Sequence, residues 1–405
     1  MKAGASEAYI LRCARRIFVG PFSKMRENSE LFGHRPTWAE IDTAALASNF
    51  QEVRRRVGPK VKVMGVVKAN AYGHGAVECA RVFEREGAEW LGVALPEEGF
   101  QLRDAGLQQP ILCFGGFWPG QERACIESNV VPVVYRVDMI EAMDSAARAL
   151  GVVADIHVKI DTGMGRLGVR FDEVREFADS VRKFENVRID GLMTHFAAAD
   201  DPRRDEFTEE QMKRFREAVA VFRERGWNPA YEDLANSAGI FGHPDSWGSM
   251  VRPGGVLYGL WRDVLPPLTE PLSFRPVMTL RTRIELVKRV RAGETLGYGC
   301  TFTAARDMTV ATLPVGYNDG YARRLSNIGR VIVRGQFARV AGRISMDLTI
   351  VDVTDVEGAG VGDVVTLVGR DGELWIPAEE VAEQAGTLSY EITCGISQRV
   401  PRLYL

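Results

Sequence analysis

A lysine ends one of the most apolar runs of the sequence. Residues 61–67, VKVMGVV, have the composition of a buried strand, and Lys68 follows them directly. Burial of a lysine at a strand end disfavours the ammonium ion and favours the neutral amine, which forms covalent bonds with carbonyl compounds. A single lysine at such a position more commonly extends into solvent. The other strand ends therefore decide between the two interpretations.

Polar motifs also stand beside four other predicted strands. Residues 161–166 (DTGMGR), 194–196 (THF) and 236–237 (NS) each follow a strand, whereas 252–255 (RPGG) precedes one. In parallel barrels, glycines and free backbone amides near the last strands form a common phosphate site. A lysine that can bond to an aldehyde, together with a phosphate site, predicts pyridoxal phosphate as the cofactor.

Strand and helix patterns alternate between residues 40 and 260. Residues 208–226, for example, carry apolar residues at helical spacing and end on glycine. Eight strand candidates are present: 61–67, 90–94, 110–114, 130–134, 155–160, 188–193, 231–235 and 255–259. Eight parallel strands with intervening helices indicate an α/β fold, an N-terminal (β/α)8 TIM-like barrel, whose active site is expected at the carboxyl ends of its strands.

The pattern changes after the proline-rich stretch 263–276. From there on, alternating strands separated by glycine and Asp-Gly turns predict a C-terminal all-β domain. We therefore expect an N-terminal extension over residues 1–37, a cofactor-binding barrel over 38–268 and a β-strand domain over 269–405.

The charge balance excludes several classes of protein. Lys+Arg 51 against Asp+Glu 54 leaves a net charge of -3, so there is no general excess of positive charge for nucleic acid or an anionic membrane. No apolar run reaches the roughly 20 residues that span a bilayer. The six cysteines are scattered, without a disulfide or metal-ligand pattern. We expect a cytoplasmic protein without a metal, whose N terminus is a surface extension rather than a targeting helix.

Several long motifs resemble those of the alanine racemase family. They run from about residue 38 to the C terminus: VVKANAYGHG, KIDTGMGRLGV, MTHFAAAD, ANSAG, MVRPGGVLYGL, LGYGCTFTA, LPVGYNDGY, RRLSNIG, AGRISMD and RVPR. The resemblance implies a pyridoxal-phosphate-dependent isomerase that interconverts L- and D-alanine.

The resemblance also implies where the cofactor binds. Lys68 would hold it covalently, Arg166 would contact its phenolic oxygen and Arg252 its pyridine nitrogen. An arginine has only donors and keeps its proton, so it would leave the ring nitrogen neutral and discourage side reactions such as transamination. The other cofactor-binding residues would be Tyr72, His195, Asn236, Ser237, Gly254, Gly255 and Gln398.

Two bases on opposite faces are the simplest way to racemise an α-carbon, because one removes a proton and the other returns one. Lys68 would serve one face. By the resemblance, Tyr298 would serve the other face in the neighbouring subunit's site, which implies a homodimer with shared active sites. Because a phenol is a weak base at neutral pH, His195, itself backed by Arg252, would stabilise the phenolate.

The substrate would be contacted by Arg166 and, from the β domain, by Tyr317, Met346 and Asp347. Gln398 stands where the family has a tyrosine that narrows the side-chain pocket. We therefore hypothesise that serine or another small amino acid is accepted beside alanine. A substitution without effect is the equal alternative, since one pocket residue seldom sets specificity by more than a few kcal/mol.

Lys159 matches a lysine that carries a carbamate in some members and balances Arg166. The alternative is an unmodified strand lysine paired with Asp155 or Asp161. The residues do not separate these two possibilities.

Two other functions remain open at this point. Decarboxylases of basic amino acids share the barrel and β-domain plan, but they are expected to pair the ring nitrogen with an acid rather than with Arg252. A non-catalytic pyridoxal-phosphate-binding protein would have no need of Tyr298.

Overall fold

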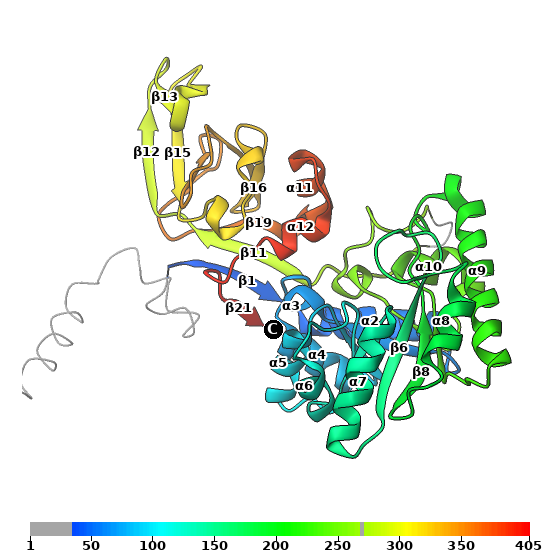
Figure 1. Ribbon diagram of the computed structural model, residues 1–405. Helices are drawn as coiled ribbons and strands as arrows, with labels where there is room; N and C mark the ends of the chain where they lie inside the picture. The colour runs from blue at the N-terminus through cyan, green and yellow to red at the C-terminus, as the bar shows by residue number, and fades with distance from the viewer. Residues whose placement is uncertain (1–34, 268–270) are drawn as a thin grey trace, which may run out of the picture. The chain divides into compact units, whose positions relative to one another are not determined.

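The computed structural model describes residues 35–267 and 271–405 of the chain. The expected N-terminal extension, residues 1–37, therefore lies almost wholly outside the described residues. The chain forms two compact units, which Figure 1 shows in ribbon form. Within the described residues, no helix has both the length and the hydropathy to traverse a lipid bilayer.

The two units are here called the barrel unit and the β unit. The barrel unit is Asp42–Val277 with Tyr404–Leu405, and the β unit is Met278–Leu403 with the described residues before Asp42, which are 35–41. These limits differ from the expected ones because β1 (Thr37–Ile41) pairs in antiparallel register with β11 (Met278–Arg283). The first described strand of the chain thus belongs to the β unit.

Eight parallel strands line the barrel unit, which confirms the predicted architecture. They are β2 (Lys62–Val66), β3 (Trp90–Val93), β4 (Ile111–Cys113), β5 (Val130–Val134), β6 (Ala154–Asp161), β8 (Val187–Met193), β9 (Tyr231–Asp233) and β10 (Met250–Val251). Their order is β10-β2-β3-β4-β5-β6-β8-β9. The barrel closes between β9 and β10, the two ends of this order. There the Ser249 amide donates to the Glu232 carbonyl at 2.9 Å, and the Arg252 amide donates to the Ala235 carbonyl at 3.0 Å.

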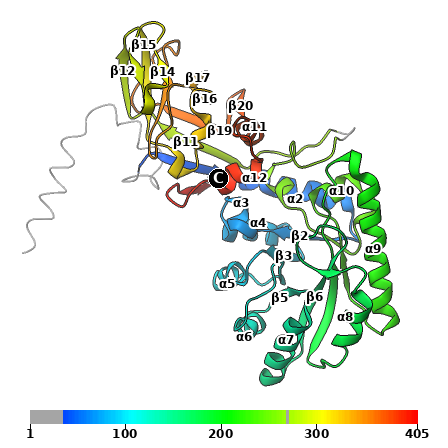
Figure 2. The same cartoon turned by 45° about the horizontal axis from the view of Figure 1, so that its top comes forward.

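Helices cover the outer side of these strands, as Figure 2 shows for α5 to α8. The main helices are α2 (Thr43–Val57), α4 (Ala76–Arg85), α5 (Pro96–Asp104), α6 (Glu122–Glu127), α7 (Val137–Leu150), α8 (Val174–Val181), α9 (Asp205–Glu224) and α10 (Ser237–Gly242). Helix α2 begins where the Asp42 carboxylate accepts from the Ala45 amide, and it ends at Gly58. The apolar faces of the helices pack against strand residues such as Ile156 and Leu192 in a continuous core.

The predicted eighth strand, residues 255–259, is wrong. Gly255–Tyr258 is a 3-10 helix, η5, and the eighth strand is β10, which lies just before it and pairs with β2. The apolar run misled the prediction because burial alone does not separate a strand from another buried segment. As a result, Arg252 follows the last barrel strand rather than preceding it, and it stands at the carboxyl end with the other motifs.

The β unit is built on an antiparallel sheet whose strands differ in length, as the alternating pattern predicted. Its strands besides β1 and β11 are β12 (Leu286–Val290), β15 (Met308–Leu313), β16 (Arg330–Val333), β17 (Gln336–Val340), β18 (Thr349–Asp352), β19 (Val364–Asp371), β20 (Leu374–Ile376) and β21 (Arg402–Tyr404). A separate hairpin joins β13 (Thr295–Leu296) to β14 (Phe302–Thr303). The unit also contains two short helices, α11 (Ala378–Ala385) and α12 (Ser389–Cys394).

Candidate active site

Lys68 begins a tight turn, α3 (Lys68–Tyr72), directly after β2 and Val67. The four residues that follow Lys68 all have φ between 53° and 55°. A left-handed turn of non-glycine residues costs roughly 1–2 kcal/mol per residue, so other contacts must hold it. It brings the Tyr72 ring back toward the lysine, whose Nζ lies 5.9 Å from the ring centroid.

Side chains and backbone from neighbouring elements hold this turn in place. The Glu98 carboxylate accepts from the Ala69 amide at 2.7 Å, and the Asn70 side chain accepts from the Ala76 amide at 2.8 Å. The Gly75 amide donates to the Asn70 carbonyl at 2.9 Å. These bonds fix the direction in which Lys68 and Tyr72 leave the backbone.

The Tyr72 hydroxyl lies against the chain at Gly254, on the segment that follows β10. A Cβ added to Gly254 would stand 2.3 Å from the Tyr72 oxygen. The Gly254 amide donates to the Ser237 hydroxyl at 2.9 Å. Asn236 caps α10 by accepting from the Gly239 amide at 2.9 Å, which sets the place of Ser237. The structure thus brings together four residues of the predicted phosphate site, and Gly255 follows as the first residue of η5.

Arg252 is buried and makes hydrogen bonds to the ends of two strands, β8 and β9. Its Nη1 donates to the Asp233 carboxylate. Its Nη2 donates to the Thr194 carbonyl at 2.7 Å and lies 3.4 Å from Nδ1 of His195. Burial lowers the pKa of Arg252 to about 9, so the guanidinium still carries its charge at pH 7.

His195 is neutral at pH 7, because burial and the positive charge of Arg252 lower its pKa well below the usual value. Since an arginine only donates, Nδ1 of His195 is the acceptor in this contact. The remaining proton therefore lies on Nε2, on the other side of the imidazole ring.

Lys159 lies within β6 and is buried. Burial, then the charges of Arg252, Arg166 and Lys68, lower the pKa of Lys159 to about 8. Arg166 itself is exposed on the loop after β6, where the Asp161 carboxylate accepts from the Gly163 and Gly165 amides at 3.0 Å. Lys159 thus lies among three other cations, Lys68, Arg166 and Arg252, whose charges repel its own.

The predicted residues of the β unit lie on exposed loops. Tyr298 is 72% exposed on the turn between β13 and β14. Tyr317 and Met346 come from adjoining segments, because the Tyr317 amide donates to the Ser345 carbonyl at 3.0 Å. Asp347 follows Met346, and Gln398 is exposed in the turn before β21.

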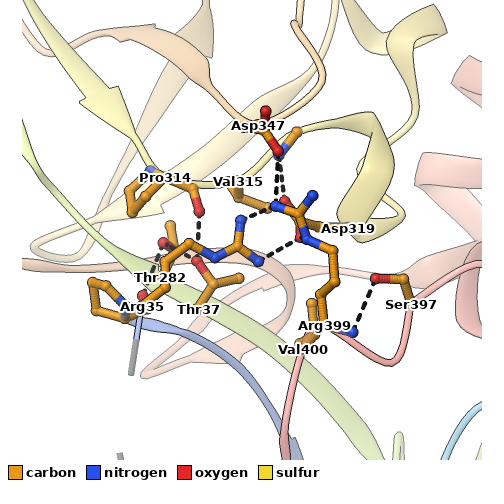
Figure 3. Close-up of polar contacts among 12 residues, drawn as sticks. Arg35, Thr37, Thr282, Pro314, Val315, Asp319, Asp347, Ser397, Arg399 and Val400 are labelled. Atoms are coloured by element: carbon orange, nitrogen blue, oxygen red, sulfur yellow. Dashed lines mark hydrogen bonds and ion pairs between the residues drawn. The ribbon is translucent and has the colours of Figure 1, made fainter. Parts of the chain in front are cut away.

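A network of ion pairs fixes these loops, and Figure 3 shows Arg35 and Arg399 converging on Asp319. Arg35 donates through Nη1 to Asp319 at 2.8 Å, and Arg399 lies 3.2 Å from the same carboxylate. Arg399 also donates to Asp347 at 2.8 Å. The fully buried Asp319 accepts in addition from the Gly316 amide at 2.9 Å, next to Tyr317.

Sequence reasoning missed the two polar residues inside the barrel, Asp233 and His157. Both are fully buried, and the His157 ring packs against the rings of Trp90 and Tyr231. Side chains two residues apart on a strand point to the same face, so Asp233 shares a face with Tyr231, and His157 shares one with Lys159. This alternation is the sequence signal that could have revealed both residues. Among the described residues, no three His, Cys, Asp or Glu side chains are grouped so that they could hold a metal ion.

Two family models match the chain in succession. The alanine racemase N-terminal domain matches residues 41–261, and the alanine racemase C-terminal domain matches residues 277–404. The chain belongs to the alanine racemase family. The resemblance noted in the sequence is thereby confirmed.

Relatives within the alanine racemase family are similar over nearly their whole length. Alanine racemase of Geobacter sulfurreducens is 44% identical over 376 residues, which are 92% of this chain and 97% of the relative. Alanine racemase of Halothermothrix orenii is 43% identical over 91% of this chain and 97% of its own. The decarboxylase interpretation is therefore not favoured.

Solved alanine racemase structures have the same fold. The Clostridium difficile protein has a TM-score of 0.87 at 36% identity, with 91% of this chain and 96% of that chain covered. A Bartonella henselae alanine racemase with covalently bound pyridoxal phosphate has a TM-score of 0.82 at 30% identity, with 91% and 99% covered.

Proposed function

We propose that this chain is a pyridoxal-phosphate-dependent alanine racemase in which Lys68 and Tyr298 act on opposite faces of the substrate. The observation that carries the proposal is the arrangement of Lys68, Tyr72 and Gly254 at the carboxyl ends of the barrel strands. The relatives supply the reaction, since they carry the name alanine racemase at 43–44% identity.

The residues of the barrel unit fit an anionic cofactor. The Tyr72 and Ser237 hydroxyls both approach Gly254, and a hydroxyl group can donate a hydrogen bond to a phosphate oxygen. The charges of Arg252, Arg166 and Lys68 help to lower the pKa of Lys159, and a negatively charged ligand would offset these charges. When bound, pyridoxal phosphate would supply an electron sink for negative charge at the substrate α-carbon.

Arg252 would face the pyridine nitrogen with a donor that does not give up its proton. The ring nitrogen would accept a hydrogen bond without becoming protonated. This makes the cofactor a weaker electron sink, which suits a rapid exchange of one proton and discourages transamination.

Two proton carriers follow from the remaining residues. Lys68 would hold the cofactor and, once released, move a proton on one face. Tyr298 would move a proton on the other face, with its oxygen accepting from the Nε2 proton of His195 in the neighbouring subunit. The His195 tautomer set by Arg252 supports this role.

The exposed surface of the β unit supports a homodimer with shared sites. Tyr298, Met346 and Tyr317 are 72%, 51% and 41% exposed. Large apolar side chains gathered on adjoining loops commonly mark an interface. Tyr317, Met346 and Asp347 would then reach the substrate beside Arg166 of the other subunit.

We also propose that the active enzyme is located in the cytoplasm.

Lys159 would balance Arg166 as a carbamate. Its lowered pKa supports the modification, because only a neutral amine reacts with carbon dioxide.

The test starts with the purified protein and added pyridoxal phosphate. A visible absorption band that borohydride bleaches, with pyridoxyl on the Lys68 peptide after digestion, is expected. L-alanine in deuterated water should then lose its optical rotation and its α-proton signal together. Release of carbon dioxide from ornithine, lysine or diaminopimelate would instead restore the decarboxylase interpretation.

Variants assign the two faces. Lys68→Ala should lose both the band and the reaction, whereas Lys288→Ala, an exposed lysine of β12, should keep both. Tyr298→Phe should slow proton removal from one alanine enantiomer far more than from the other in single-turnover assays. Equal slowing of both enantiomers, or full activity of a monomer at limiting dilution, would contradict the proposal.

A further inference from the structure

The barrel interior holds a carboxylate directly behind Arg252. Asp233 is the last residue of β9 and is fully buried, and one of its oxygens accepts from Nη1 of Arg252. A buried carboxylate is strongly disfavoured unless a partner compensates its charge. Arg252 provides that compensation, so the two side chains form one ion pair inside the barrel.

The other terminal nitrogen of Arg252, Nη2, contacts backbone carbonyls and Nδ1 of His195. Its Nη2 donates to the carbonyls of Thr194 at 2.7 Å and Leu234 at 3.2 Å, at the ends of β8 and β9. Carbonyl groups fix orientation but carry no net charge. Asp233 therefore supplies both the bond on Nη1 and the negative charge.

His157 does not neutralise this carboxylate. Its Nδ1 lies 3.8 Å from the second Asp233 oxygen, and neither ring nitrogen has a hydrogen-bond partner among the described residues. Burial, then the charge of Arg252, lower the pKa of His157 to about 3, so the imidazole is neutral at pH 7. The negative charge of Asp233 is thus compensated by the guanidinium of Arg252 and not by His157.

We infer that Asp233 is a positioning residue, which holds Arg252 in place for the pyridine nitrogen and offsets its positive charge there. The inference rests on the proposed function. An arginine paired in this way offers the ring a hydrogen bond without a full uncompensated charge behind it. Asp233 would thereby set how strongly the cofactor attracts electrons.

The charge of Asp233 matters because the surroundings are rich in cations. The ionisable groups that face this region come from β6, the loop after it, the end of β8, β10 and the turn after β2: His157, Lys159, Asp161, Arg166, His195, Arg252 and Lys68. Removing one buried negative charge makes the field at the cofactor more positive. A protonated cofactor–lysine linkage then becomes less favourable, so it should lose its proton at lower pH.

The experiment compares the pH titration of the visible cofactor band in three cofactor-loaded proteins. Asp233→Asn should move the midpoint to lower pH by about one unit. Asp233→Glu keeps the charge and should stay close to the wild-type midpoint. Asp144→Asn is the control, because Asp144 is also buried and ion-paired, with Arg148 at 2.5 Å, but on the outer helix α7.

The outcomes separate the two proposals. An unshifted midpoint in Asp233→Asn, or an equal shift in Asp144→Asn or in Asp233→Glu, would overturn the role of the Asp233 charge while leaving the proposed function intact. A wild-type protein without the visible band would overturn the proposed function, and the inference with it. Where Asp233→Asn does not fold, Asp233→Ser, which leaves room for water, carries the same expectation.

Discussion

The hydroxyl oxygen of Tyr72 lies so close to Gly254 that a Cβ on this glycine would stand 2.3 Å away from it. Tyr72 belongs to the turn after the first barrel strand, and Gly254 to the segment after the last. The contact therefore links the segments that follow β2 and β10, which are neighbouring strands of the barrel. It also brings the Tyr72 hydroxyl to Gly254, whose amide donates to the Ser237 hydroxyl at 2.9 Å.

Gly254→Ala should weaken binding of pyridoxal phosphate by about tenfold to a hundredfold. The added methyl group would push away the Tyr72 hydroxyl, and a hydrogen bond to a charged group contributes roughly 1.5–3 kcal/mol. Titration of the apoprotein with cofactor measures the affinity. Gly360→Ala is the control, since the nearest atom to its added Cβ would be 3.9 Å away. Equal affinity of the two variants would argue against a phosphate site at Gly254.

Asp319→Asn should lower the free energy of unfolding by about 3 kcal/mol, because Arg35 and Arg399 would lose the buried carboxylate that they share. Urea unfolding measures the change. Asp355→Asn serves as the control, since its pair with Arg306 is exposed and such pairs contribute little. A similar loss in both variants would mean that burial of Asp319 does not matter.

The pattern of apolar and polar residues along the sequence predicted the barrel, the β domain and the motifs at the strand ends, because strand alternation and helical spacing are local properties. These local patterns could not predict the left-handed turn after Lys68. Ala69, Ala71 and Tyr72 all disfavour positive φ, and the contacts that hold them there include one from a residue distant in the sequence, Glu98.

The pairing of Asp233 with Arg252 was equally hidden, since it depends on how the barrel closes between β9 and β10. The expected strand at 255–259 failed for a related reason. A buried apolar segment beside a closing strand satisfies the hydrophobic pattern whether or not it joins the sheet.

His157→Phe should make the apoprotein more resistant to acid. The folded-state pKa of His157 is about 3, against roughly 6.5 for an unfolded histidine. Above pH 6.5 both states are neutral and the histidine has no penalty. As the pH falls below 6.5, only the unfolded state takes up the proton, so stability is lost until about pH 3. Between pH 6.5 and 5 the wild type should lose about 2 kcal/mol more than the variant.

Urea unfolding of both proteins at several pH values checks this difference. The carboxylates away from position 157 titrate alike in both proteins, so their contribution cancels in the comparison. The phenyl ring keeps the packing against Trp90 and Tyr231, and the two proteins should therefore be similar in stability at pH 8. Parallel stability curves from pH 6.5 to 5 would show that His157 protonates in the folded state.

Gln398→Tyr should shift substrate preference toward alanine. Glutamine is slimmer than tyrosine and both donates and accepts hydrogen bonds, so it leaves room and a partner for the hydroxyl of serine. Gln398 is exposed in the β unit. The measurement is the ratio of kcat/KM for L-alanine and L-serine, which should rise about tenfold, since one pocket contact contributes roughly 1–3 kcal/mol. Gln336→Tyr, an exposed glutamine of β17, should leave the ratio unchanged. A ratio that stays constant in Gln398→Tyr as well would exclude a role for this position in specificity.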